Sequence, residues 1–117
     1  MENLILNFDK NVDLNFANTI GENLERKLEN LGFEIKLPMK TDWGYVFRII
    51  FEKKEFDIII RENENTEKSI VITVDSTLSK IEKLLGRKDD VEKIALKKVI
   101  SENIKTTGNR VDGSARN

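Results

Sequence analysis

The stretch GYVFRIIFEKKEFDIIIRENENTEKSIVITVDS, residues Gly44–Ser76, decides the fold of this chain. Apolar side chains recur at every second position in three runs, which short polar segments separate. A period of two places alternate side chains on opposite faces of a strand, and runs joined by short turns pair as antiparallel neighbours. The stretch therefore predicts three strands of an antiparallel meander, with Lys53-Lys54 as the tight connection between the first two.

The same alternation divides the side chains of these strands between two faces. The first face is strongly apolar and is expected to form the core; it holds Tyr45, Phe47, Ile49, Phe51, Phe56, Ile58, Ile60, Ile70, Ile72 and Val74. The second face mixes aliphatic and charged side chains; it holds Val46, Arg48, Ile50, Glu52, Asp57, Ile59, Arg61, Val71, Thr73 and Asp75. Burial of the first face alone is enough to stabilise a domain if helices cover it.

The sequence before this stretch predicts a helix and a fourth strand. Apolar residues repeat every three or four positions from Asp13 to Gly32, with Asp13 or Asn15 as the capping residue and Gly32 at the end. Gly21 inside this helix costs up to about 1 kcal/mol relative to Ala, and the sequence offers no packing reason for it. Residues 33–37 alternate as a strand, which Pro38 ends or marks as an edge strand. The short run 4–8 is either a strand or a lead-in to the helix.

The sequence after Ser76 predicts two helices and a tail. Ser76 or Thr77 can cap a short helix that ends at Gly86, with Leu78, Ile81, Leu84 and Leu85 inside. Asp89 and Glu92 then open a second helix as a capping-box variant, whose apolar residues are Val91, Ile94, Ala95, Val99, Ile100 and Ile104. The predicted fold is α+β, with an N-terminal helix, a four-stranded antiparallel meander and two C-terminal helices packed on one face. Residues 1–108 form a single domain, and 109–117 form a flexible tail.

Composition narrows the classes of function. The chain of 117 residues has a net charge of -1, which argues against nucleic acid or a membrane surface as the partner. It contains no cysteine and no histidine, so thiolate chemistry, imidazole bases and their metal sites are absent. No phosphate-binding loop or nucleophile motif occurs. We therefore expect a cytoplasmic protein that is not an enzyme and that carries no cofactor or metal.

Two features remain as candidate binding sites. Trp43-Gly44-Tyr45 is either an aromatic lip for a ligand or simply a strand start that covers the end of the core. The second face of the sheet is either a protein-binding surface with an apolar centre and a charged rim or a solvated face with cross-strand ion pairs such as Arg48 with Asp57.

Several segments resemble the small bacterial immunity proteins of contact-dependent toxin systems. These segments are Asp42-Trp43-Gly44-Tyr45 with the two alternating strands after it, and Leu84-Leu85-Gly86-Arg87 before the last helix. The resemblance implies a protein that binds a toxin domain stoichiometrically and neutralises it. We expect the chain to be a monomer or a homodimer. A secretion-chaperone-like homodimer and a small enzyme using carboxylates are the alternatives.

Overall fold

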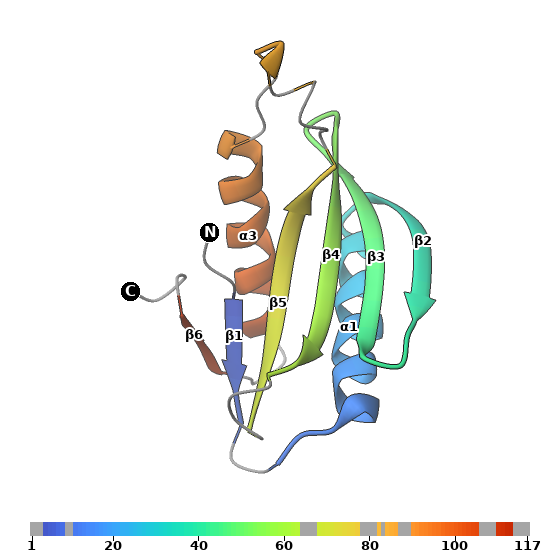
Figure 1. Cartoon of the computed structure of the whole chain (residues 1–117), viewed down its shortest axis with the longest axis vertical. Helices are drawn as coiled ribbons and strands as arrows, with labels where there is room; N and C mark the ends of the chain where they lie inside the picture. Colours follow the sequence, from blue (N-terminus) through green and yellow to red (C-terminus); the bar gives the residue numbers. More distant parts are fainter. Residues whose placement is uncertain are drawn as a thin grey trace.

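The computed structural model describes residues 4–8, 11–63, 68–77, 82, 84–86, 90–105 and 110–113 of the chain (Figure 1). These residues form an α+β fold in which two helices accompany an antiparallel sheet. In chain order the elements are β1 (Leu4–Asn7), α1 (Leu14–Asn30), β2 (Glu34–Lys40), β3 (Gly44–Phe51), β4 (Lys54–Glu62), β5 (Ser69–Ser76), α3 (Asp90–Lys105) and β6 (Arg110–Gly113).

Helix α1 begins and ends at the residues that the sequence predicts. The Asp13 carboxylate accepts a hydrogen bond of 2.8 Å from the Phe16 amide, which satisfies a free N–H of the first turn. At the other end Gly32 has a φ of 99°, and the Gly32 and Phe33 amides donate to the Glu29 and Leu28 carbonyls. This pair of bonds is a Schellman motif, in which glycine avoids the steric cost of a left-handed residue.

The sheet contains the predicted meander and extends beyond it. Its strand order is β2-β3-β4-β5-β1-β6, and every neighbouring pair is antiparallel. Strands β2 to β5 form the four-stranded meander, whereas β1 pairs with β5 and resolves the ambiguity of the first apolar run. Strand β6 pairs with β1, although the sequence predicts a flexible tail at these residues. The prediction of four strands is therefore too low.

A two-residue turn joins β3 to β4. Glu52 and Lys53 occupy it with φ values of 53° and 67°, and Phe51 pairs with Lys54 across its base. Two successive left-handed residues match the right-handed twist of the paired strands. The turn therefore lies one residue earlier than the predicted connection at Lys53-Lys54.

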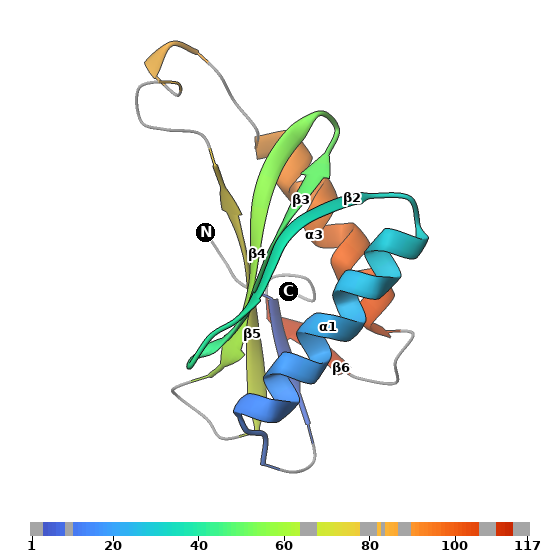
Figure 2. The same ribbon diagram turned by 90° about the vertical axis from the view of Figure 1, so that its right-hand side faces the viewer.

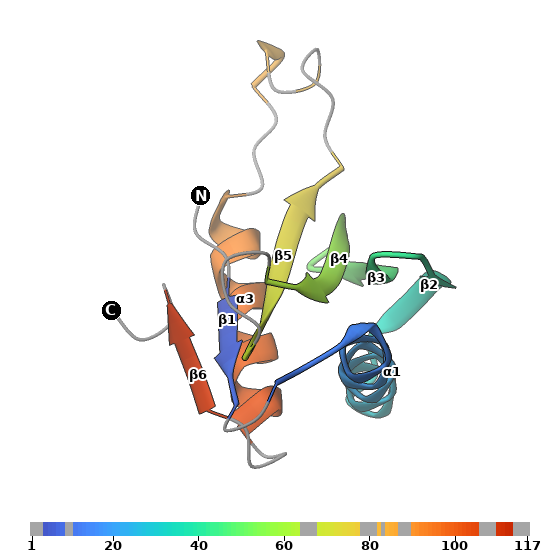
Figure 3. The same cartoon turned by 60° about the horizontal axis from the view of Figure 1, so that its bottom comes forward.

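Both helices lie on the same side of the sheet (Figure 2). Helix α1 contacts β2, β3 and β4, while α3 contacts β5 and β6; Figure 3 shows the two helices along different parts of the sheet. Between the helices and the sheet lies one core, which holds the predicted apolar face together with side chains of β1 and of both helices. The prediction that helices pack on one face is confirmed for α1 and α3.

The inward side of α3 differs from the predicted one. The structure buries Leu96, Ile100, Ser101 and Ile104, whereas Val91 and Ile94 are 76% and 65% exposed. Apolar residues lie on several sides of this helix, so the spacing alone does not select which side packs. A further constraint on α3 comes from the Lys54 ammonium, whose 3.0 Å hydrogen bond to the Glu92 carboxylate lowers the pKa of Glu92.

The predicted short helix before α3 lies mostly outside the described residues. Leu84 and Leu85, expected inside it, are 86% and 76% exposed. The prediction that these two leucines pack inward is therefore wrong. Asp89, the predicted cap of the last helix, also lies outside the described residues, and α3 begins at Asp90.

Candidate protein-binding face of the sheet

One face of the sheet points away from both helices, and we call it the open face. Each strand has one side in the core, so the alternate side chains of the same strand point to the other side. In the part of the chain that the structure describes, neither helix packs on that side, which faces the viewer in Figure 1. The open face consists of Ile5, Glu34, Lys36, Met39, Val46, Arg48, Ile50, Glu55, Asp57, Ile59, Arg61, Val71, Thr73 and Asp75. Val71 is the exception on this face, because it is only 8% exposed and offers little surface to a partner.

An apolar row crosses the middle of the open face. Met39, Val46, Ile59 and Thr73 lie side by side on β2, β3, β4 and β5, because each pairs with the next in the sheet register. Val46 and Ile59 are partly exposed, and Met39 at the edge is 55% exposed. Aliphatic side chains thus meet solvent at the centre of the face, where a bound protein would remove them from water.

A cross-strand ion pair lies beside this row. The Arg48 Nε donates a hydrogen bond of 2.8 Å to Asp57 Oδ1, and its Nη2 donates one of 3.3 Å to Oδ2. Arg48 and Asp57 are directly paired residues of β3 and β4, which brings their side chains together. The hydrogen bonds to the Asp57 carboxylate raise the pKa of the Arg48 guanidinium. The cross-strand ion pair that the solvated-face interpretation names is therefore present.

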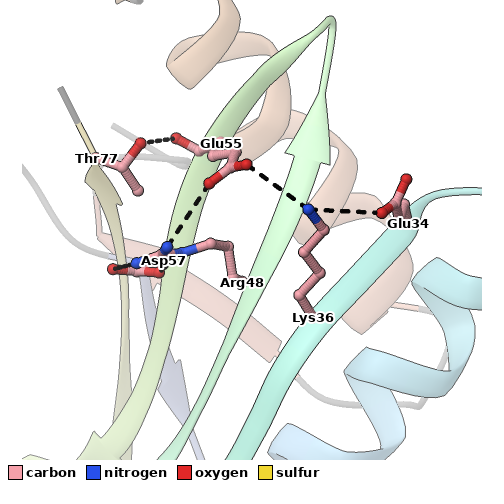
Figure 4. A network of polar contacts seen from close by, with 6 residues as sticks. All are labelled: Glu34, Lys36, Arg48, Glu55, Asp57 and Thr77. Atoms are coloured by element: carbon pink, nitrogen blue, oxygen red, sulfur yellow. Dashed lines mark hydrogen bonds and ion pairs between the residues drawn. The ribbon is translucent and has the colours of Figure 1, made fainter.

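The pair belongs to a longer chain of charges across three strands (Figure 4). Arg48 Nη1 lies 3.6 Å from Glu55 Oε1, and Lys36 Nζ lies 3.8 Å from Glu55 Oε2 and 3.7 Å from Glu34 Oε2. The Thr77 hydroxyl donates a 3.0 Å hydrogen bond to the Glu55 carbonyl, so the end of β5 is tied to β4. These contacts are partly solvent-exposed and contribute at most about 1 kcal/mol each. Their main consequence is that Arg48 and Asp57 are held in a fixed orientation.

Three residues that the sequence assigns to the binding site lie elsewhere. Glu52 is exposed at the β3–β4 turn. Tyr45 is only 6% exposed and lies in the core beside α1, where its hydroxyl donates to the Glu25 carboxylate. Burial, and then this hydrogen bond, raise the pKa of Tyr45. The placement of Tyr45 excludes it from a ligand-binding lip.

Trp43, the third, is a separate exposed aromatic side chain on the loop between β2 and β3. It is 45% exposed, and the Thr41 hydroxyl holds the loop by accepting hydrogen bonds from the Trp43 and Gly44 amides, at 3.2 and 2.9 Å. A Cβ on Gly44 would lie 2.0 Å from the Ile60 carbonyl oxygen, so this loop requires glycine for close approach to β4. The strand-start interpretation thus explains Gly44 and Tyr45 but leaves the Trp43 ring exposed to solvent.

The open face also contains residues that the sequence analysis missed. Ile5 joins it because β1 pairs with β5, and a four-residue run does not reveal its strand partner. Met39 joins it because one extra residue interrupts the β2–β3 register between Lys36 and Met39. Such a bulge reverses the alternation beyond it. Pro38 was the only signal of this irregularity in the sequence.

Acidic side chains, a cleft and the length of the helices are further features of the described residues. No group of three acidic side chains converges there in a way that could hold a metal ion. A cleft of about 220 Å³ lies between α1 and α3, and its lining includes Phe16, Ile20, Lys27 and Asn103. Neither described helix is long and apolar enough to cross a membrane. Comparison of the chain with protein-family models, with curated proteins and with solved structures finds no match.

Proposed function

We propose that this chain is a protein-binding module and that the open face of its sheet is the binding surface. The observation that carries the proposal is the placement of both described helices on the opposite side, which leaves aliphatic side chains of β3 and β4 in contact with solvent. An apolar centre with charged surroundings is typical of surfaces that bind other proteins.

The ion pairs belong to a solvated face as well, but the charge network can also serve binding. Arg48 is an interface-prone residue, and its two hydrogen bonds to Asp57 fix the guanidinium before any partner arrives. A side chain that is already ordered loses little conformational entropy on binding. The alternating charges around it would also select partners by complementarity and speed their association.

The more specific proposal is that the module acts as an inhibitor of the immunity-protein type. Such a protein works by stoichiometric binding, so it needs a docking surface and no catalytic group. The open face supplies the surface, and the resemblance of the segments around residues 42–45 and 84–87 supplies the class of partner, a toxin domain.

The test exchanges the charges of the central pair without removing them. The double variant Arg48→Asp with Asp57→Arg keeps a cross-strand ion pair and the net charge, but it reverses the charge pattern on the open face. A matched control exchanges Glu22 and Lys40, whose side chains lie 3.7 Å apart on the helix side of the sheet. Circular dichroism and urea unfolding verify that both variants fold.

Binding is measured by calorimetry against the protein encoded immediately upstream of this chain in its source genome. We expect the Arg48/Asp57 exchange to raise Kd by about tenfold or more, since reversed charges turn attraction into repulsion at the interface. The Glu22/Lys40 exchange should leave Kd unchanged. Equal affinity of both exchanged variants would exclude the open face, and no binding to the upstream protein would exclude the inhibitor role.

A further inference from the structure

Two charged side chains of the open face make no ion pair with any described residue. Arg61 and Asp75 are both exposed, and they carry opposite charges. The other charges of the face, from Glu34 to Asp57, are joined to one another through the network in Figure 4. The face therefore presents one cation and one anion that a second molecule could satisfy.

The positions of these two charges are symmetric about the apolar row. Arg61 pairs with Val71, Ile59 pairs with Thr73, and Asp57 pairs with Asp75. Along the strands, Arg61 thus lies two residues from the Ile59–Thr73 pair in one direction. Asp57 and Asp75 lie two residues from the same pair in the opposite direction. Each step of two residues is about 6–7 Å along the strands.

We propose that the open face binds a second copy of this chain, with a two-fold axis that runs along the apolar row. This axis is perpendicular to the strands. A half turn about it places the second sheet face to face with the first and reverses the direction of its strands. Residues on the axis keep their positions along it. The row of Met39, Val46, Ile59 and Thr73 would then pack on the same row of the second copy. Arg61 of each copy would face the Asp57–Asp75 pair of the other, so the dimer contains this charged contact twice.

This arrangement also relieves a repulsion within the single chain. Asp57 and Asp75 are directly opposite each other on β4 and β5, where like charges are unfavourable. In the dimer the guanidinium of Arg61 from the second copy lies over both carboxylates. Two sheets packed in this way lie about 10 Å apart with their strands rotated by about 30°. We expect a weak dimer of the micromolar class, because the row on its axis holds only three aliphatic side chains and one threonine.

This inference rests on the proposal that the open face is an interface, and it names a second copy as one occupant. The two proposals can fail separately, because self-association is measured on this chain alone and inhibitor binding is measured with the upstream protein. A dimer that competes with that partner would hold the apolar row out of water until the partner arrives.

The test compares the wild type with two charge-reversal variants, alone and mixed, in sedimentation velocity over a range of micromolar concentrations. In a dimer of the Arg61→Asp variant, the introduced aspartate of each copy faces the Asp57–Asp75 pair of the other, so every contact joins like charges. In a dimer of the Asp75→Arg variant, Arg61 of each copy faces one aspartate, Asp57, and one introduced arginine. Each variant alone should dimerise about tenfold more weakly than the wild type, given two altered contacts per dimer.

An equimolar mixture of the two variants should form a heterodimer that is tighter than the dimer of either variant alone. One of its two contacts is the wild-type contact, because the Asp75→Arg chain keeps Arg61 and the Arg61→Asp chain keeps both aspartates. In the other contact, the carboxylate introduced by Arg61→Asp faces the guanidinium introduced by Asp75→Arg. The second contact also retains Asp57, so it is a mixed contact. The heterodimer thus keeps one complete wild-type contact, whereas the dimer of either variant alone keeps none.

Mixing does not change the sequence of either variant, so it cannot repair a misfolded chain. Tighter dimerisation in the mixture than in either variant alone therefore reports on the contact between the two chains. Ile59→Asp provides a third variant that should abolish dimers alone and in every mixture, since Ile59 lies on the proposed axis. A monomeric wild type throughout the range would overturn the inference. So would a mixture of the Arg61 and Asp75 variants that dimerises no better than either alone. In both cases inhibitor binding through the open face would still be open to its own test.

Discussion

Substitution of Gly21 by alanine should destabilise this protein, although alanine is the better helix former. Gly21 lies in the middle of α1 on the side that faces β3. A Cβ at this position would lie 2.7, 2.8 and 2.9 Å from Cδ2, Cβ and Cγ of Tyr45. The packing reason that the sequence does not reveal is therefore the close approach of α1 to this tyrosine.

The magnitude follows from two opposed terms. Alanine in place of an interior helical glycine gains up to about 1 kcal/mol through backbone entropy. Two of the three contacted atoms, Tyr45 Cβ and Cγ, lie at the root of the side chain and cannot swing aside, so α1 has to move outward by about 0.5–1 Å to restore ordinary contact. Overpacking of this kind costs about 1–3 kcal/mol. The difference between these two terms is about 0–3 kcal/mol. Because three Tyr45 atoms lie within 3.0 Å of the new Cβ, we expect Gly21→Ala to lower the free energy of unfolding by about 1–2 kcal/mol.

Urea unfolding followed by circular dichroism measures this difference. At a typical urea m-value for a small protein, the midpoint should fall by about 0.5–1.5 M with the m-value unchanged. Thr19→Ala is the matched control, because Thr19 lies on the exposed side of the same helix and should change the midpoint little. An unfolding midpoint for Gly21→Ala at or above that of the wild type would refute the argument, because it would show that α1 and Tyr45 do not pack this closely.

Three further substitutions test other contacts of the fold. Tyr45→Phe removes the hydroxyl that donates to Glu25 and should cost about 0.5–1.5 kcal/mol in urea unfolding at neutral pH. Because the folded pKa of Tyr45 is raised, the native state holds this proton more tightly than the unfolded state, so the wild type should lose stability as pH rises above about 10 and Tyr45→Phe should lose less. Gly44→Ala should be more damaging than Gly21→Ala, because its Cβ would lie 2.0 Å from the Ile60 carbonyl oxygen; little soluble folded protein on expression is the expected result, and a normal yield and midpoint would contradict it. Arg48→Met should change stability by about 1 kcal/mol or less in thermal unfolding, since its ion pair is partly exposed, and a larger loss would mean that the network is a main support of the sheet.

The centre of this fold could be predicted from the sequence, whereas its edges could not. The alternation in Gly44–Ser76 specified β3, β4 and β5 because each face of these strands has a distinct chemical character. Strands β1 and β6 have four residues each, and such short segments become strands only through their neighbours. The prediction for α3 names Ile94 and omits Leu96 for a related reason, since both residues are apolar and only packing selects Leu96.

The candidate site was predictable to the extent that it depends on alternation. Arg48, Asp57 and Ile59 lie on the open face because their strand neighbours lie in the core. Proximity to Trp43 in the sequence suggests a site role for Tyr45, whereas alternation places Tyr45 with Phe47 on the core side, where the structure has it. Pattern along a strand was thus the reliable guide, and nearness in sequence to a distinctive side chain was not.

The edge of the sheet at β2 bears on how a partner can bind. Strand β2 is an outer strand of the sheet, and its partner-free side would otherwise invite another strand to pair with it. Pro38 has no amide hydrogen to donate, Leu37 has a φ of 53°, and the register shifts between Lys36 and Met39. These three irregularities interrupt the row of backbone donors and acceptors that strand addition needs. We therefore expect a partner to bind through side chains on the open face and not by adding a strand to β2. The same bulge also turns Met39 onto the open face, where it extends the apolar row to the edge of the sheet.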